Sequence, residues 1–136
     1  MSRCGMYQCR KCDDYQSRYE RAIHLEDDYR RQENDAEEKA EECERNRDDC
    51  YSEYQRLSYQ SYNLYRGDND SNDWQSDRLQ READDYNYKA NDCNNEALRL
   101  RFEAAISKGR ADNYKCEAES IKRDWDQHVL IGNTNY

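Results

Sequence analysis

Apolar and small residues recur at every seventh position through the second half of the chain. One series consists of Ala83, Ala90, Ala97, Ala104, Ala111, Ala118 and Trp125. The series interleaved with it consists of Leu79, Tyr86, Cys93, Leu100, Ser107, Tyr114, Ile121 and His128. This heptad is typical of a long helix that packs along one seam against another helix. The alanines predict a close approach of the two backbones, because small side chains leave room for it.

The first half carries a heptad of the same kind, with more polar interruptions. Its two series are Tyr15, Ala22, Tyr29, Ala36, Cys43, Cys50, Leu57, Leu64 and Tyr19, Glu26, Glu33, Ala40, Arg47, Tyr54, Ser61. A turn-like stretch, Gly-Asp-Asn-Asp-Ser-Asn-Asp, separates the halves. We therefore expect one domain with a cysteine-containing segment over 1–11, helices over 12–66 and 73–128, a loop over 67–72 and a tail over 129–136.

The predicted fold class is all-α: a long antiparallel two-helix coiled-coil hairpin with an alanine-rich, close-packed seam, associating into a larger helical bundle or filament. A short loop makes the two helices antiparallel neighbours. With the turn centred near Asp70, Leu57 lies opposite Ala83, and Cys12 lies opposite His128. A register one heptad closer, centred on Arg66 and Gly67, is the alternative. Such alanine seams occur in unrelated proteins, so the packing type predicts no function.

The composition agrees with long helices and argues against a globular enzyme. Only 35% of the residues are hydrophobic, 39% are charged, and there is no proline. The net charge of -9 argues against nucleic acid as a partner. No apolar run is long enough for a membrane span, and the first residues lack the apolar core of a secretory signal. We expect a cytoplasmic protein, or a part of an extruded or extracellular assembly if another export route is used.

Two groups of large side chains fall outside the seam and predict an interface. On the second helix, Leu98, Phe102, Ala105 and Ile106 form an outward apolar stripe. Near the loop, five tyrosines lie off the seam: Tyr51, Tyr59, Tyr62, Tyr65 and Tyr88. The plainer interpretation is that a coiled coil tolerates scattered exposed apolar residues.

A strongly acidic stretch runs over residues 26–49 of the first helix. It holds twelve acidic and five basic side chains. A solvated helix face explains such a stretch, and the alternatives are a surface for a basic partner or a place for loosely held divalent cations.

The seven cysteines carry most of the candidate chemistry. Cys4, Cys9 and Cys12 form a C-x4-C-x2-C cluster, and the expected register brings His128 beside Cys12. Together they would make a Cys3His zinc site that closes the open end of the hairpin. Intermolecular disulfides are the alternative in an oxidising environment. Cys116 falls on the outermost helix position, where it could crosslink subunits.

No catalytic residues and no cofactor other than zinc are predicted. There are two histidines, no Gly-rich phosphate loop and no nucleophile elbow. The expected function is that of a structural, self-assembling subunit of a filament, tube or cytoskeletal or appendage-like assembly, with copies of itself as partners. The alternatives are an acidic adaptor rod that docks another helical or basic protein, and a zinc- or redox-linked binding protein that uses the N-terminal cysteines.

Overall fold

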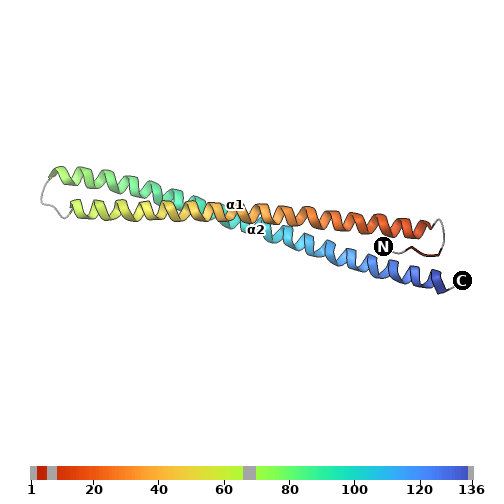
Figure 1. The fold of residues 1–136 in the computed structure, drawn as a ribbon. Coiled ribbons are helices and arrows are strands. Elements are labelled where there is room, and N and C mark those ends of the chain that lie inside the picture. Colours follow the sequence, from red (N-terminus) through yellow and green to blue (C-terminus); the bar gives the residue numbers. More distant parts are fainter. Residues whose placement is uncertain (1–2, 6–8, 66–69, 135–136) are drawn as a thin grey trace. The chain divides into compact units, whose positions relative to one another are not determined.

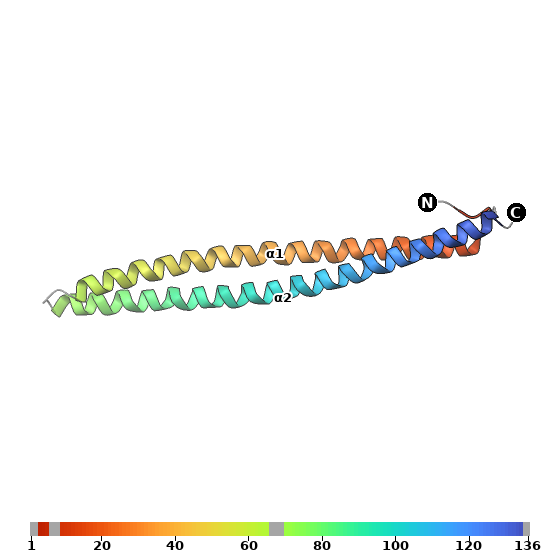
Figure 2. The same ribbon diagram turned by 90° about the horizontal axis from the view of Figure 1, so that it is seen from below.

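Two long helices make up almost all of the described chain. The computed structural model describes residues 3–5, 9–65 and 70–134, with α1 over Arg10–Tyr65 and α2 over Asp70–Thr134. The helices pack against each other as a hairpin, as the ribbons show (Figure 1, Figure 2). The predicted all-α helical hairpin is confirmed. Association into a bundle or filament stays a prediction.

The helix ends differ from the expected boundaries. Helix α1 begins at Arg10 rather than at 12, and α2 begins at Asp70 rather than at 73. Residues 67–69 of the expected loop lie outside the described residues, and residues 70–72 of that loop belong to α2. Helix α2 continues to Thr134, into the stretch expected to form a tail. The physical reason is that Val129 packs beside Trp125 and extends the buried face of the helix, whereas Leu130 and Ile131 are exposed.

The buried positions follow the expected seam. All seven members of the alanine series are buried on α2: Ala83, Ala90, Ala97, Ala104, Ala111, Ala118 and Trp125. The buried seam residues of α1 are Cys12, Ala22, Ala36, Ala40, Leu57 and Ser61. Larger seam residues such as Tyr29 and Tyr86 are half-buried. A buried alanine therefore lies against the other helix in every heptad from Ala83 to Ala118, as close packing requires.

The chain divides into two compact units. We call residues 1–35 and 103–136 the terminal unit, and residues 36–102 the loop unit. Each unit contains one stretch of α1 and one stretch of α2. The expectation of a single domain stays a prediction, and the two units are described in turn.

The terminal unit has a core of mixed side chains. Trp125 and Val129 are buried together with three cysteines, and Ile121 is buried with Ala22 and Ala118. Farther along the seam the rings of Tyr29 and Tyr114 stack, with centroids 5.8 Å apart.

A charge network accompanies this tyrosine pair. Arg30 donates a 2.8 Å hydrogen bond to Asp112 of the other helix. The same guanidinium lies 3.8 Å from Glu26 and 3.7 Å from Glu33, the two carboxylates of the seam. Arg30 thus provides a counter-charge for both half-buried acids, which would otherwise be costly to bury.

The loop unit has a core of small residues closed by a serine pair. Ser61 Oγ donates to the backbone carbonyl of Ser76 at 2.8 Å, and Ser76 Oγ donates to that of Ser61 at 2.9 Å. Both serines are buried, and the reciprocal bonds satisfy them.

Cross-helix contacts in the loop unit also identify the register. Arg47 donates a 2.9 Å hydrogen bond to Asn94, next to Cys93, the residue that the expected register places opposite Arg47. The alternative register would have placed Tyr86 there. The two helices therefore pair in the register in which the turn is centred near Asp70.

Candidate metal centre

Four potential metal ligands meet at the end of the terminal unit. The ligand atoms of Cys4, Cys9, Cys12 and His128 all lie within 4.8 Å of one another. The three cysteines are buried and the histidine is half-buried. Zinc–sulfur bonds of about 2.3 Å in a tetrahedron require ligand atoms roughly 3.5 to 4 Å apart. A small contraction would bring the four atoms to that spacing, so this Cys3His cluster could hold a metal ion.

The start of helix α1 positions two of the ligands. Cys9 immediately precedes the helix, and its Sγ accepts a 3.4 Å hydrogen bond from the backbone N–H of Cys12. A side-chain acceptor in this place is an N-cap, here with sulfur instead of oxygen. The partial positive charge at a helix N-terminus favours a thiolate, the form of cysteine that binds metals. The C-x2-C spacing therefore places both sulfurs on the first turn in a setting suited to negative charge.

The segment before α1 brings the third thiol over this turn. The backbone N–H of Cys4 donates to Cys12 Sγ at 3.3 Å. The neighbouring Arg3 forms a 2.6 Å ion pair with Asp13 on α1. These contacts return the segment onto the helix, so that Cys4 lies beside Cys9 and Cys12 although no regular element carries it.

Helix α2 supplies the fourth ligand from the opposite side. His128 Nε2 lies 3.2 Å from Cys9 Sγ, and its ring packs at 5.8 Å from that of Tyr15. Hydrogen bonds from the Cys4 thiol, from His128 and from the Cys12 backbone N–H, in that order of strength, lower the pKa of Cys9 from 9.0 to about 6. The arrangement thus favours a thiolate at Cys9 at neutral pH.

The cluster is embedded in apolar side chains. Trp125 and Val129 are buried against the cysteines, and Tyr15 and Tyr19 pack at the edge. Such a shell excludes water, which strengthens the interaction between a cation and its thiolate ligands. The indole Nε1 of Trp125 is buried without a hydrogen-bond partner among the described residues.

The expected interface residues are exposed. Leu98, Phe102 and Ile106 are 62%, 68% and 41% exposed, and Ala105 is exposed as well. The five tyrosines are also exposed: Tyr51, Tyr59, Tyr62, Tyr65 and Tyr88. Trp74 in the loop unit is also exposed, at 67%, and was not among the expected interface residues. Its position outside the heptad, next to the turn, could have indicated this exposure. The interface itself stays a prediction.

The remaining cysteines behave differently from the cluster. Cys43, Cys50 and Cys93 are half-buried on the seam, and Cys116 is exposed. Burial raises the pKa of the Cys93 thiol, with a smaller contribution from Cys50. A crosslinking role for Cys116 stays a prediction.

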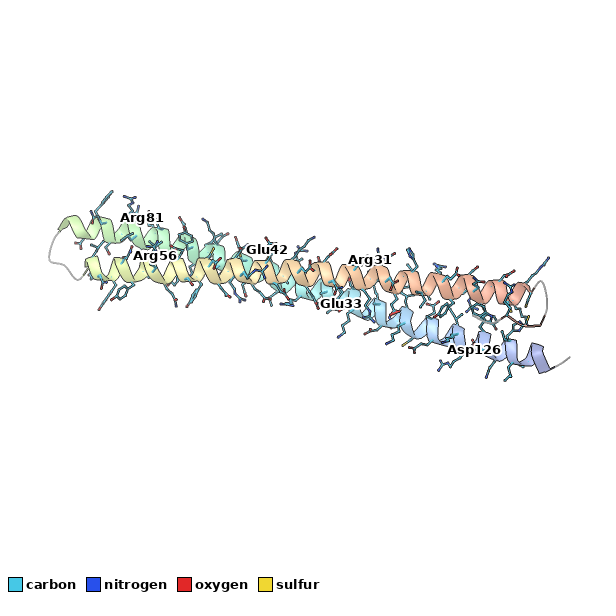
Figure 3. The ribbon with its side chains drawn as sticks, viewed as in Figure 1. Arg31, Glu33, Glu42, Arg56, Arg81 and Asp126 are labelled. Atoms are coloured by element: carbon cyan, nitrogen blue, oxygen red, sulfur yellow. The ribbon has the colours of Figure 1, made fainter. Side chains whose placement is uncertain are left out.

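Charged side chains cover the outside of both helices. Arg31, Glu42 and Arg81 are examples, and all three are exposed (Figure 3). Part of the acidic stretch is neutralised within the hairpin, since Glu44 accepts a 3.0 Å hydrogen bond from Arg101 of α2. No helix in the described part of the chain has an apolar stretch of the length needed to cross a membrane.

The chain is an antiparallel helical hairpin with a Cys3His cluster where α1 begins. Comparisons with protein-family models, curated proteins and solved structures find no match. The argument for function therefore depends on the geometry of the cluster and on the exposed surfaces.

Proposed function

We propose that this protein is a structural helical hairpin in which Cys4, Cys9, Cys12 and His128 bind one Zn²⁺. The observation that carries the proposal is the convergence of these four ligand atoms within 4.8 Å. Three thiolates and one imidazole are a ligand set of structural zinc sites, which have no open coordination position. The proposed role of the metal is to hold the fold together.

Zinc suits the donor set better than the other common divalent cations. Magnesium and calcium prefer oxygen ligands, whereas thiolates and imidazole favour softer ions. The backbone N–H groups that donate to Cys9 and Cys12 Sγ stabilise negative charge on sulfur and leave the sulfur free to bind a metal. Zinc is redox-inert and takes tetrahedral coordination readily.

The proposed metal would join three parts of the chain. It would link the segment before α1, the first turn of α1 and the last turns of α2. Helix ends and terminal segments open most easily in the absence of such links. A zinc ion at this point would therefore suppress fraying of the terminal unit.

The test is metal content and ligand identity in the full chain, purified under reducing conditions. We expect one zinc per chain, and for the Co²⁺-substituted protein the visible absorption of a tetrahedral thiolate site. Cys12→Ser should abolish both, whereas Cys116→Ser, which alters an exposed thiol outside the cluster, should change neither. Folded, reduced wild-type protein that binds neither Zn²⁺ nor Co²⁺ would refute the proposal.

Self-association is the second candidate function, and the exposed aromatic side chains of the loop unit favour it. Tyr59, Tyr65, Trp74 and Tyr88 are each at least two-thirds exposed. Tyrosine and tryptophan are enriched at protein interfaces because they bury a large area and keep a polar edge. Copies of the chain would associate through these side chains into a filament or bundle.

Sedimentation velocity and electron microscopy of the purified protein test this second candidate. We expect oligomers or filaments that the Tyr59→Ser, Tyr65→Ser, Tyr88→Ser triple variant loses at unchanged helicity. A wild-type chain that stays monomeric at all concentrations would exclude self-assembly. The adaptor hypothesis, with another helical or basic protein as partner, would then take its place.

A further inference from the structure

A glycine on α2 lies directly against the residue that carries one of the four ligands. Gly132 follows His128 by one helical turn, in the stretch of α2 that extends past the expected helix end. A Cβ atom added to Gly132 would be 3.0 Å from Cys4 Cβ and 3.9 Å from Cys4 Cα. At this distance a side chain at 132 would be tighter against Cys4 than nearly all Cβ contacts in proteins, so Cys4 would have to move by a few tenths of an ångström.

The need for glycine at 132 is steric rather than conformational. No described glycine has a positive φ, so the backbone at 132 would accept any L-residue. Gly109, on the same helix and in the same unit, has nothing within 4 Å of an added Cβ. Alanine is the better helix former at both positions, but of the two only 132 would bring its Cβ into a tight contact with another part of the chain.

The collision would be transmitted to the metal ligand. The atom in the way is the Cβ of Cys4, which bears the ligand sulfur, and not the far end of a flexible side chain. The Cys4 segment is also held by its hydrogen bond to Cys12 Sγ and by the Arg3–Asp13 ion pair. A shift of Cys4 away from α2 would displace its sulfur relative to the other three candidate ligands, which belong to or adjoin the two helices.

We propose that Gly132 is the positioning residue that makes the site four-coordinate, because it alone leaves room for Cys4 to close over α2. This inference depends on the proposed zinc function. With a side chain at 132, the metal keeps Cys9, Cys12 and His128 and has an open fourth position. Three protein ligands and one open position distinguish reactive zinc sites from closed structural ones. One glycine thus decides to which of these classes the site belongs.

The experiment compares full-length wild type, Gly132→Ala, Gly109→Ala and Cys4→Gly as Co²⁺ and Zn²⁺ complexes. Thiolate-to-cobalt charge-transfer absorption scales with the number of bound sulfurs. We expect Gly132→Ala and Cys4→Gly to lose about a third of it, since two thiolates would remain of three, and to respond to added imidazole. Zinc affinity, measured by chelator competition, should fall at least about tenfold in both variants. Gly109→Ala should match wild type in both measurements.

A double-mutant cycle shows whether Gly132 acts through Cys4. Cys4→Gly removes the Cβ that an alanine at 132 would meet, so adding Gly132→Ala to it should cost no further affinity. The cycle remains informative if Gly132→Ala alone folds poorly, because the double variant Cys4→Gly, Gly132→Ala has no Cβ at position 4 for the alanine to contact.

The outcomes separate this inference from the proposed function. If wild type binds no metal, the zinc proposal fails, and this inference fails with it. If wild type binds zinc and Gly132→Ala equals Gly109→Ala in absorption and affinity, only the role of Gly132 is refuted. Additive losses in the double variant would also refute it, because Gly132 would then act by another route.

Discussion

The terminal unit and the loop unit share one heptad pattern but place their large side chains differently. In the terminal unit Trp125, Ile121 and Val129 are buried beside the cysteines. In the loop unit the buried residues are mostly alanine, leucine and serine, and Tyr59, Trp74 and Tyr88 are exposed. The same helical periodicity therefore supports a buried cysteine cluster in one unit and exposed aromatic side chains in the other.

The difference suggests that the two units are stabilised by different means. A buried tryptophan removes a large apolar area from water, and the proposed metal adds coordinate bonds. The loop unit depends on close backbone packing and on the hydrogen bonds of Ser61, Ser76 and Arg47. Substitutions that lower the stability of one unit and leave the other unchanged can test whether the two units are stabilised differently.

The two tryptophans allow the sharpest comparison. We expect Trp125→Ala to destabilise the protein by about 3–5 kcal/mol, because it removes a buried aromatic ring. Trp74→Ala, at an exposed position, should change monomer stability by no more than about 0.5 kcal/mol. Urea denaturation followed by circular dichroism measures both. Equal effects of the two substitutions would contradict the assignment of the cores.

Metal removal should weaken the terminal unit selectively. At free zinc 100 times its dissociation constant, binding stabilises the folded form by about 2.7 kcal/mol. Chelation should therefore speed hydrogen exchange at the start of α1 and the end of α2, and leave residues 36–102 nearly unchanged. Hydrogen exchange with mass spectrometry measures this. Uniform acceleration along the chain would show that the metal acts on the hairpin as a whole.

The serine pair gives a smaller effect confined to the loop unit. Ser61→Ala should cost about 1 kcal/mol, because Ser76 loses a buried hydrogen-bond donor to its carbonyl. The double variant Ser61→Ala, Ser76→Ala should change the free energy of unfolding less, since two alanines would then face each other as small residues do elsewhere on the seam. Ser52→Ala, at an exposed position, is the control. A double variant worse than the sum of the two single variants would refute this account.

Thiol reactivity provides the smallest and most local comparison. At neutral pH Cys116 should be alkylated several-fold faster than Cys93, because Cys116 is exposed and burial raises the pKa of Cys93. With zinc bound, Cys4, Cys9 and Cys12 should be protected until a chelator is added. Mass spectrometry of iodoacetamide-treated protein measures the order of labelling. Labelling of Cys93 before Cys116 would contradict the burial pattern.

Much of the fold could be predicted because it depends on local periodicity. The alanine series identified the buried face of α2, and the turn composition implied an antiparallel partner. The register that places Cys12 beside His128 also followed from the length of the loop. The extension of α2 past His128 was missed, because Val129 shows its role only when the Cys4 segment and Trp125 are packed against it.

What the sequence by itself determined is the heptad, the turn composition and the four candidate metal ligands, since each depends on residue spacing along the chain or across one short loop. The tertiary structure alone decided the rest. It brought Cys9 and His128, 119 positions apart, to 3.2 Å, and it folded the segment before α1 back over the helix end. It also placed Gly132 under Cys4, a contact that follows no periodicity and arises from the space available between two backbones.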